Sequence, residues 1–111
     1  MLNHREKRRY VALMYDSSET YQPFQLHEKI GIRFRELFGI FPMQSAMLKL
    51  YDSEFRNIMI VRCKLKYLDC FLVSLALTEP PLTVVSISGT LKKLRKNVSK
   101  KDFRNIKNIR S

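Results

Sequence analysis

The order in which apolar patterns follow one another along the chain constrains its fold more than any other feature. Segments with strand-like and helix-like spacing of apolar residues alternate as strand, helix, strand, strand, helix and strand. The six segments are residues 8–16, 25–38, 44–51, 56–63, 67–78 and 82–87. This order is the split β-α-β pattern. It predicts an α+β, ferredoxin-like or RRM-like sandwich in which both helices cover one face of an antiparallel sheet.

Two of these segments are apolar on more than one side. In 56–63 apolar residues occupy both alternating faces, so we expect a central strand that is covered at least partly on both sides. In 67–78 a second apolar stripe, formed by Cys70, Val73 and Leu77, lies beside the first. We expect this helix to be buried on more than one side. The second stripe therefore predicts an interface with another subunit, or self-association in its absence.

After the last strand the chain continues through three polar residues into a basic helix. Ser88, Gly89 and Thr90 interrupt the strand with a glycine that is free to take a positive φ and with two good helix N-caps. The following residues have helical spacing. Leu91, Leu94 and Val98 form the apolar stripe of this helix, and Lys92, Lys93, Arg95 and Lys96 surround it.

The chain has 111 residues, enough for one domain, and its formal net charge of +11 lies at the two ends. Residues 1–10 hold four basic side chains and one acidic one, and residues 89–111 hold nine and one, whereas residues 11–88 hold eight of each. We expect a single α/β domain over 1–98 that begins with a basic arm, and a basic tail over 99–111. Charge concentrated in this way indicates a polyanionic partner, most often nucleic acid.

Several other functions find no support in the sequence. There is no apolar run of the roughly 20 residues that span a bilayer and no signal-peptide pattern, so we expect a cytoplasmic protein without membrane contact. Cys63 and Cys70 belong to no close Cys/His cluster, which indicates packed, reduced thiols. His4 and His27 lack partners at catalytic or metal-binding spacing, and we expect His27 at the surface. We predict no catalytic residues, no metal site and no cofactor bound by the protein.

Base stacking is a further question, because RNA-recognition domains of this topology stack bases on aromatic residues of their first and third strands. Tyr10 and Tyr15 belong to the first strand, but residues 56–64 contain no aromatic residue. Contact through phosphates and RNA shape is therefore favoured over stacking of single-stranded bases.

Several short motifs resemble the archaeal ribonuclease P protein component 2 family, to which subunits of eukaryotic ribonuclease P and MRP are related. The resemblance covers about residues 8–98. Its motifs are Arg9-Tyr10, Gly39, Ile60-Val61-Arg62-Cys63, Ser74-Leu75-Ala76-Leu77, and the stretch from Val85 to Leu91 followed by Lys92-Lys93. The stretch Ser88-Gly89-Thr90-Leu91 and the pair Arg62-Cys63 are the most specific. Pro42 and Asn57 depart from the pattern, since they stand where glycines are usual in the family.

The resemblance implies a non-catalytic subunit of ribonuclease P, the RNA-based endoribonuclease that removes the 5′ leader from precursor tRNA. The implied partners are the ribonuclease P RNA, precursor tRNA through the complex, and the TIM-barrel protein subunit. Magnesium ions are expected on the RNA, and a eukaryotic source would imply a nuclear or nucleolar location. The protein would neutralise phosphate repulsion and stabilise the RNA fold.

The residues expected to contact RNA come from the basic ends and the strand termini. They are Arg8, Arg9, Arg62, Ser88, Gly89, Thr90, Lys92, Lys93, Arg95 and Lys96. Two other functions remain open. One is a ribosomal or other ribonucleoprotein assembly factor, which the charge pattern alone supports. The other is a protein–protein adaptor whose basic tail binds an acidic partner.

Overall fold

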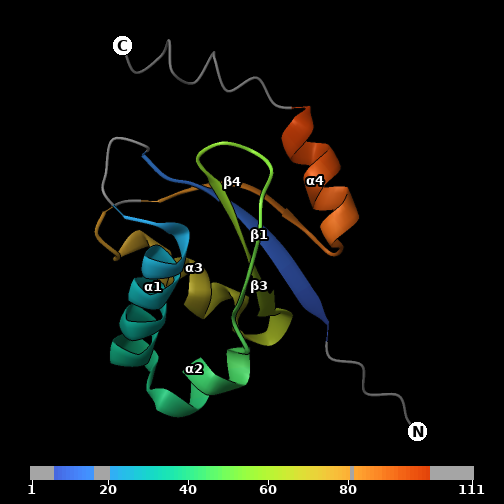
Figure 1. Ribbon diagram of the computed structural model, residues 1–111. Helices are drawn as coiled ribbons and strands as arrows, with labels where there is room; N and C mark the ends of the chain where they lie inside the picture. The colour runs from blue at the N-terminus through green and yellow to red at the C-terminus, as the bar shows by residue number, and fades with distance from the viewer. Residues whose placement is uncertain (1–6, 17–20, 81, 101–111) are drawn as a thin grey trace, which may run out of the picture.

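The computed structural model describes residues 7–16, 21–80 and 82–100. Its elements are β1 Arg8–Met14, α1 Pro23–Phe38, α2 Ile40–Ala46, β2 Lys49–Tyr51, β3 Ile58–Lys64, the 3-10 turn η1 Leu65–Tyr67, α3 Leu68–Ala76, β4 Thr83–Ser88 and α4 Leu91–Ser99. The strands form one antiparallel sheet in the order β2-β3-β1-β4. The helices α1 and α3 lie on one side of this sheet and α4 lies on the other (Figure 1). The predicted α+β, ferredoxin-like fold is confirmed.

The main core lies between the sheet and the helices α1 and α3. The apolar stripe predicted for residues 25–38 is buried there, together with one side of α3 and alternate residues of the two central strands. Its buried members are Val11, Leu13, Leu26, Ile30, Phe34, Ala46, Met59, Val61, Cys63, Phe71 and Leu75. Burial of one large apolar side chain contributes about 1.5–3 kcal/mol, so this layer supplies most of the apolar stabilisation of the domain.

A second apolar cluster lies on the opposite face of the sheet, under α4. Leu94 and Val98 are buried and pack against Ala12, Ile58 and Ile60. The strand β3 lies between β2 and β1 and has buried apolar neighbours on both faces, as its sequence predicted. The basic helix predicted after Thr90 is therefore also a structural cover for the sheet.

The segment 44–51, expected to be a strand, divides into the end of α2 and the short strand β2. Gly39 ends α1 with φ 96° and directly precedes α2, and glycine adopts this φ without steric cost. Pro42 fits the first turn of α2, where an N–H has no helical partner. Met47 ends α2 in the left-handed region at φ 50°, which leaves three residues for β2 at the sheet edge. Alternating apolar residues favoured a strand over 44–51. The backbone conformations of Gly39 and Met47 instead allow a short helix between them.

The helix α3 is buried on one side only, so the prediction that residues 67–78 are buried on more than one side is wrong. Val73 is 45% exposed, Leu77 is 51% exposed, and Cys70 is half-buried. Within the described segments α3 packs against α1 and the sheet, and Val73 and Leu77 of its second apolar stripe face outward. Val73 and Leu77 thus form an exposed apolar strip, whereas Cys70 packs at the edge of the main core.

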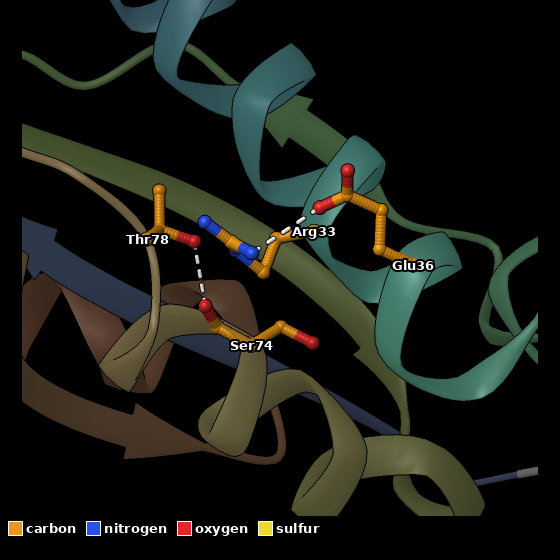
Figure 2. A network of polar contacts seen from close by, with 4 residues as sticks. All are labelled: Arg33, Glu36, Ser74 and Thr78. Atoms are coloured by element: carbon orange, nitrogen blue, oxygen red, sulfur yellow. Dashed lines mark hydrogen bonds and ion pairs between the residues drawn. The ribbon is translucent and has the colours of Figure 1, made fainter.

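Side-chain hydrogen bonds mark the end of α3. The Ser74 Oγ donates to the Cys70 carbonyl at 2.8 Å, and the Thr78 Oγ1 donates to the Ser74 carbonyl (Figure 2). On the neighbouring helix α1, Arg33 pairs with Glu36 at 3.3 Å, and its side chain extends toward Thr78 (Figure 2). This end of the helix pair is therefore polar, in contrast to the apolar strip on the outer side of α3.

Candidate nucleic-acid interface

The four strands bring one row of mostly basic and polar residues to the same face of the sheet. Strand by strand, the row runs through Lys49, Arg62, Tyr10 and Ser88, each opposite the next. Residues paired across antiparallel strands point to the same face. Tyr10 packs against the apolar cluster under α4, so the whole row lies on the α4 side of the sheet.

Neighbouring pairs extend this row in both directions along the strands. Arg8 lies opposite Lys64, at the start of β1 and the end of β3. Tyr51 lies opposite Ile60, on the other side of the row along β3. We refer to Arg8, Tyr10, Lys49, Tyr51, Arg62 and Lys64 as the basic sheet face. It combines four cations and two aromatic rings on three adjacent strands, and none of its six members is acidic.

Tyr51 is in contact with three other members of the basic sheet face. Its ring lies 5.7 Å from the ring of Tyr10 in an edge-to-face arrangement. Arg62 donates from Nη1 to the Tyr51 hydroxyl at 3.1 Å, and its Cζ lies 5.9 Å from the ring centroid. Lys49 Nζ lies 5.2 Å from the same centroid. Cation–π contacts hold both cations beside one ring, and each cation keeps further N–H groups with which to bind an anion.

Four members of the basic sheet face are absent from the predicted site, namely Tyr10, Lys49, Tyr51 and Lys64. Spacing carried a signal for two of them, because Lys49 and Tyr51 are two residues apart in a strand and therefore share a face. The prediction against base stacking considered only the first and third strands, whereas the second aromatic ring comes from β2. Lys64 is brought in only by the pairing of β3 with β1, which spacing alone does not give.

The start of α4 is fixed beside this row because β4 ends at Ser88. Thr90 is the N-cap of α4, and its Oγ1 accepts a hydrogen bond from the Lys93 backbone N–H at 3.2 Å. The Ser88 Oγ accepts from the Thr90 backbone N–H at 3.4 Å. The two hydroxyls thus position the helix and are already occupied by backbone partners.

Lys92, Lys93 and Lys96 are exposed on α4, on the side away from its buried stripe. Arg95 differs from these three lysines. It is half-buried, its Nη2 donates to the Asp52 carbonyl at 3.2 Å, and its Nε is buried without a hydrogen-bond partner. Arg95 therefore ties α4 to the turn between β2 and β3 and is less exposed than the three lysines.

Gly89 does not take the positive φ that its place between strand and helix suggested. Among the described residues, Gly39 is the only glycine with a positive φ. A Cβ on Gly89 would lie 3.7 Å from Nη1 of Arg9, and this same nitrogen donates to the Arg8 carbonyl at 2.9 Å. The Arg9 guanidinium therefore lies against the start of α4, at a distance where a Cβ on Gly89 would make an ordinary van der Waals contact.

The described titratable groups outside this face include a buried thiol and a half-buried imidazole. Burial, and secondarily the neighbouring Cys70, raises the pKa of the Cys63 thiol to about 12, and both cysteines are free. His27 is half-buried and not at the surface as expected; burial lowers its pKa, and its Nδ1 has no hydrogen-bond partner. Across the described residues, no three His, Cys, Asp or Glu side chains come together to hold a metal ion. Nor does any helix in this part of the chain have the length and apolarity needed to cross a bilayer.

Together the fold and these contacts define an α+β sandwich with a basic sheet face and a basic covering helix. No protein-family profile matches the chain. No curated protein matches it either. Among solved structures, it is similar to a chain in a cryo-EM structure of yeast ribonuclease MRP, with a TM-score of 0.59 at 12% sequence identity. The alignment covers 96% of this chain and 98% of that chain, so the two share a fold over nearly their whole lengths.

Proposed function

We propose that this protein is a subunit of a ribonucleoprotein of the ribonuclease P and MRP class, and that it binds structured RNA. The observation that carries the proposal is the gathering of Arg8, Lys49, Arg62 and Lys64 on one face of three adjacent strands. The exposed lysines of α4 belong to the helix that packs on this same side of the sheet. The fold shared with a ribonuclease MRP chain and the motif resemblance to ribonuclease P subunits both support this class of complex.

The chemistry expected of such a subunit is charge neutralisation. RNA that folds into compact helices brings phosphates close together, and cations fixed on a protein surface replace the diffuse counterions around them. Arg62 and Lys49 are held against the ring of Tyr51, so both cations are partly ordered before RNA binds. Less side-chain entropy is lost when such groups meet a phosphate.

The finer role that we propose is that of a non-catalytic subunit of ribonuclease P, which acts in 5′ leader removal from precursor tRNA. The catalytic RNA would carry the magnesium ions, and this chain would stabilise the RNA fold. The TIM-barrel protein subunit would dock on the exposed apolar strip of Val73 and Leu77, with the half-buried Cys70 at its edge. A eukaryotic source would imply a nuclear or nucleolar location for the complex.

Sequencing of the RNA that co-purifies with the tagged protein tests this proposal. Ribonuclease P RNA, together with precursor tRNA, is the expected result, and MRP RNA would assign the chain to the MRP branch of the same class. A matched variant with Lys49→Ala, Arg62→Ala and Lys64→Ala should lose this RNA. A control with Lys29→Ala, Arg33→Ala and Arg35→Ala, which removes the same charge from α1, should keep it. Recovery of ribosomal RNA would instead support an assembly factor, and nuclease-resistant association with protein alone would support an adaptor.

The non-catalytic part of the proposal has its own test. Purified protein, freed of nucleic acid, should leave precursor tRNA intact in the presence of magnesium. Addition of the catalytic RNA and the other protein subunits should restore cleavage at the mature 5′ end. Specific cleavage by the protein alone, abolished by a change in one of its own carboxylates, would overturn this reading.

A further inference from the structure

A pocket of about 530 Å³ opens beside the end of the basic sheet face that holds Arg8 and Lys64. It lies between α2, η1 and the residue that precedes β1. It is lined by Lys7, Phe41, Ser45, Lys64, Leu65, Lys66 and Tyr67. Its volume falls in the range of about 300–1,000 Å³ that small-molecule sites occupy. The pocket adjoins the proposed RNA surface directly, because Lys64 belongs to both and Lys7 precedes Arg8 in the chain.

The walls of this pocket are held by the backbone. The Leu65 N–H donates to the Lys7 carbonyl at 2.8 Å, which fixes the residue before β1 against the first residue of η1. Lys64 is the extended residue at which β3 ends and the 3-10 turn begins. The helix α2 packs against η1 and carries Phe41 to the opposite wall. The pocket is therefore formed by ordered elements and not by one surface loop.

The lining of the pocket is both cationic and aromatic. Its described lining residues carry three ammonium groups, two hydroxyls and no carboxylate, so it favours an anion. It also carries two aromatic rings. Phe41 is 73% exposed, and Lys66 Nζ lies 5.8 Å from the centroid of the Tyr67 ring. An exposed phenyl ring beside ammonium groups matches a nucleotide, whose base presents a flat face for stacking and whose phosphate is anionic.

We propose that this pocket binds one unpaired nucleotide of the RNA, with its base stacked on Phe41 and its phosphate held by Lys7, Lys64 and Lys66. The inference rests on the proposed function and extends it, since the basic sheet face alone would bind paired regions through their phosphates. An RNA strand that leaves a helix on the sheet face would pass Lys64 and place its first unpaired base in the pocket. The protein would thereby mark a helix–single-strand junction in the RNA.

The test uses the full chain and two ligands: a short oligoadenylate that carries 2-aminopurine, and a blunt RNA duplex. Phe41→Ala should weaken binding of the oligoadenylate about ten-fold, the loss expected for one base–aromatic stack, and should abolish the quenching of 2-aminopurine. It should leave duplex binding unchanged. Ile40→Ala is the matched control, because Ile40 is an equally apolar neighbour on α2, is 56% exposed and does not line the pocket. Ile40→Ala should leave the binding of both ligands unchanged.

Two further measurements make the outcome decisive. Lys66→Ala should reduce the salt dependence of oligoadenylate binding by about 0.7 in slope, the value for one contact to a single strand. Adenosine monophosphate, a free nucleotide with the same chemistry, should bind much more weakly than the oligoadenylate. Equal effects of Phe41→Ala and Ile40→Ala, or equally tight binding of the free nucleotide, would overturn the proposal. If the unmodified protein does not bind the duplex, the proposed function itself is contradicted. Failure of the pocket proposal and failure of the proposed function are therefore distinguishable.

Discussion

Arg62 of β3 donates a hydrogen bond to the hydroxyl of Tyr51 on the neighbouring strand β2, at 3.1 Å. The two residues are not directly opposite each other, since Arg62 pairs with Lys49 and Tyr51 pairs with Ile60. The guanidinium therefore reaches diagonally across the strand pair, and its carbon lies 5.9 Å from the ring centroid. This contact fixes a cation at the middle of the basic sheet face while its other N–H groups stay available to an anion.

The first prediction concerns this cation. Arg62→Ala should weaken binding of structured RNA and reduce the slope of log Kd against log salt concentration by roughly 0.7–0.9, the value for one lost phosphate contact. Arg56→Ala is the matched control, because Arg56 is exposed in the turn between β2 and β3, outside the basic sheet face. Fluorescence anisotropy over a salt series measures both slopes. Equal slopes for the two variants would mean that net charge alone determines binding.

The second prediction concerns the exposed lysines of α4. The triple variant Lys92→Ala, Lys93→Ala and Lys96→Ala should reduce the salt slope by about 2–3, since three phosphate contacts are removed. Circular dichroism should show an unchanged fold, because Leu94 and Val98 carry the packing of α4. Arg95 is left intact in this variant, since its hydrogen bond to the Asp52 carbonyl holds the helix in place.

A control variant separates position from charge. Lys29→Ala, Arg33→Ala and Arg35→Ala removes three positive charges from α1, on the opposite side of the sheet (Figure 1). Its salt slope should stay close to that of the unmodified protein. A triple α4 variant with an unchanged slope would place α4 against a protein and would favour the adaptor function.

The fold could be predicted from the sequence because its elements are strongly patterned. The stripe of Leu26, Ile30 and Phe34 has helical spacing and is buried, and β3 is apolar on both faces and central. The helix α2 could not be predicted in the same way. Its seven residues are too few to show a helical period, and its limits depend on the backbone conformations of Gly39 and Met47.

The candidate site was only partly predictable, because strand pairing brings together residues that are distant in the sequence. Arg62 and Arg8 were predicted, but their neighbours Lys49 and Lys64 follow from the register of the sheet. Arg95 shows another limit, since its hydrogen bond to the Asp52 carbonyl follows from the packing of α4 and could not be predicted from its basic neighbours; its contact with RNA stays a prediction. Asn57 takes φ 64°, which shows how asparagine can occupy a position where the resembling family usually has glycine.

The third prediction concerns the pH dependence of stability. Burial raises the pKa of the Cys63 thiol from its ordinary value of 9.0 to about 12. Between these two values the unfolded chain releases the proton and the folded chain keeps it, so ionisation favours unfolding. The free energy of unfolding should therefore fall as the pH rises above about 9, by up to about 1.4 kcal/mol per pH unit from this group. Below that pH the contribution of Cys63 should be constant.

Urea unfolding under reducing conditions, from about pH 7 to about pH 10, checks this expectation. Lysines and tyrosines also titrate near the upper end, so the informative quantity is the difference from Cys63→Ala. That difference should be constant at lower pH and should shrink above about pH 9. Cys70→Ala removes the smaller cause of the raised pKa of Cys63 but keeps its burial, so it should follow the unmodified protein closely over this pH range. An identical pH slope for Cys63→Ala would show that the thiol does not ionise on unfolding in this range.

The last prediction concerns the exposed apolar strip on α3. Val73 and Leu77 are 45% and 51% exposed, so replacement of both by Asp should leave the domain folded while placing two carboxylates on the strip. If the TIM-barrel subunit docks there, the amount that co-purifies with Val73→Asp, Leu77→Asp should fall at least ten-fold, because each buried, unpaired carboxylate opposes association. Binding of RNA by the isolated chain should not change, since the strip lies on the opposite side of the sheet from the basic sheet face. Leu37→Asp, Met47→Asp is the control, because it makes the same change at exposed positions of α1 and the end of α2. Quantitative mass spectrometry of the tagged complexes compares the two variants, and equal losses of the subunit would show that the added negative charge, and not the α3 strip, determines docking.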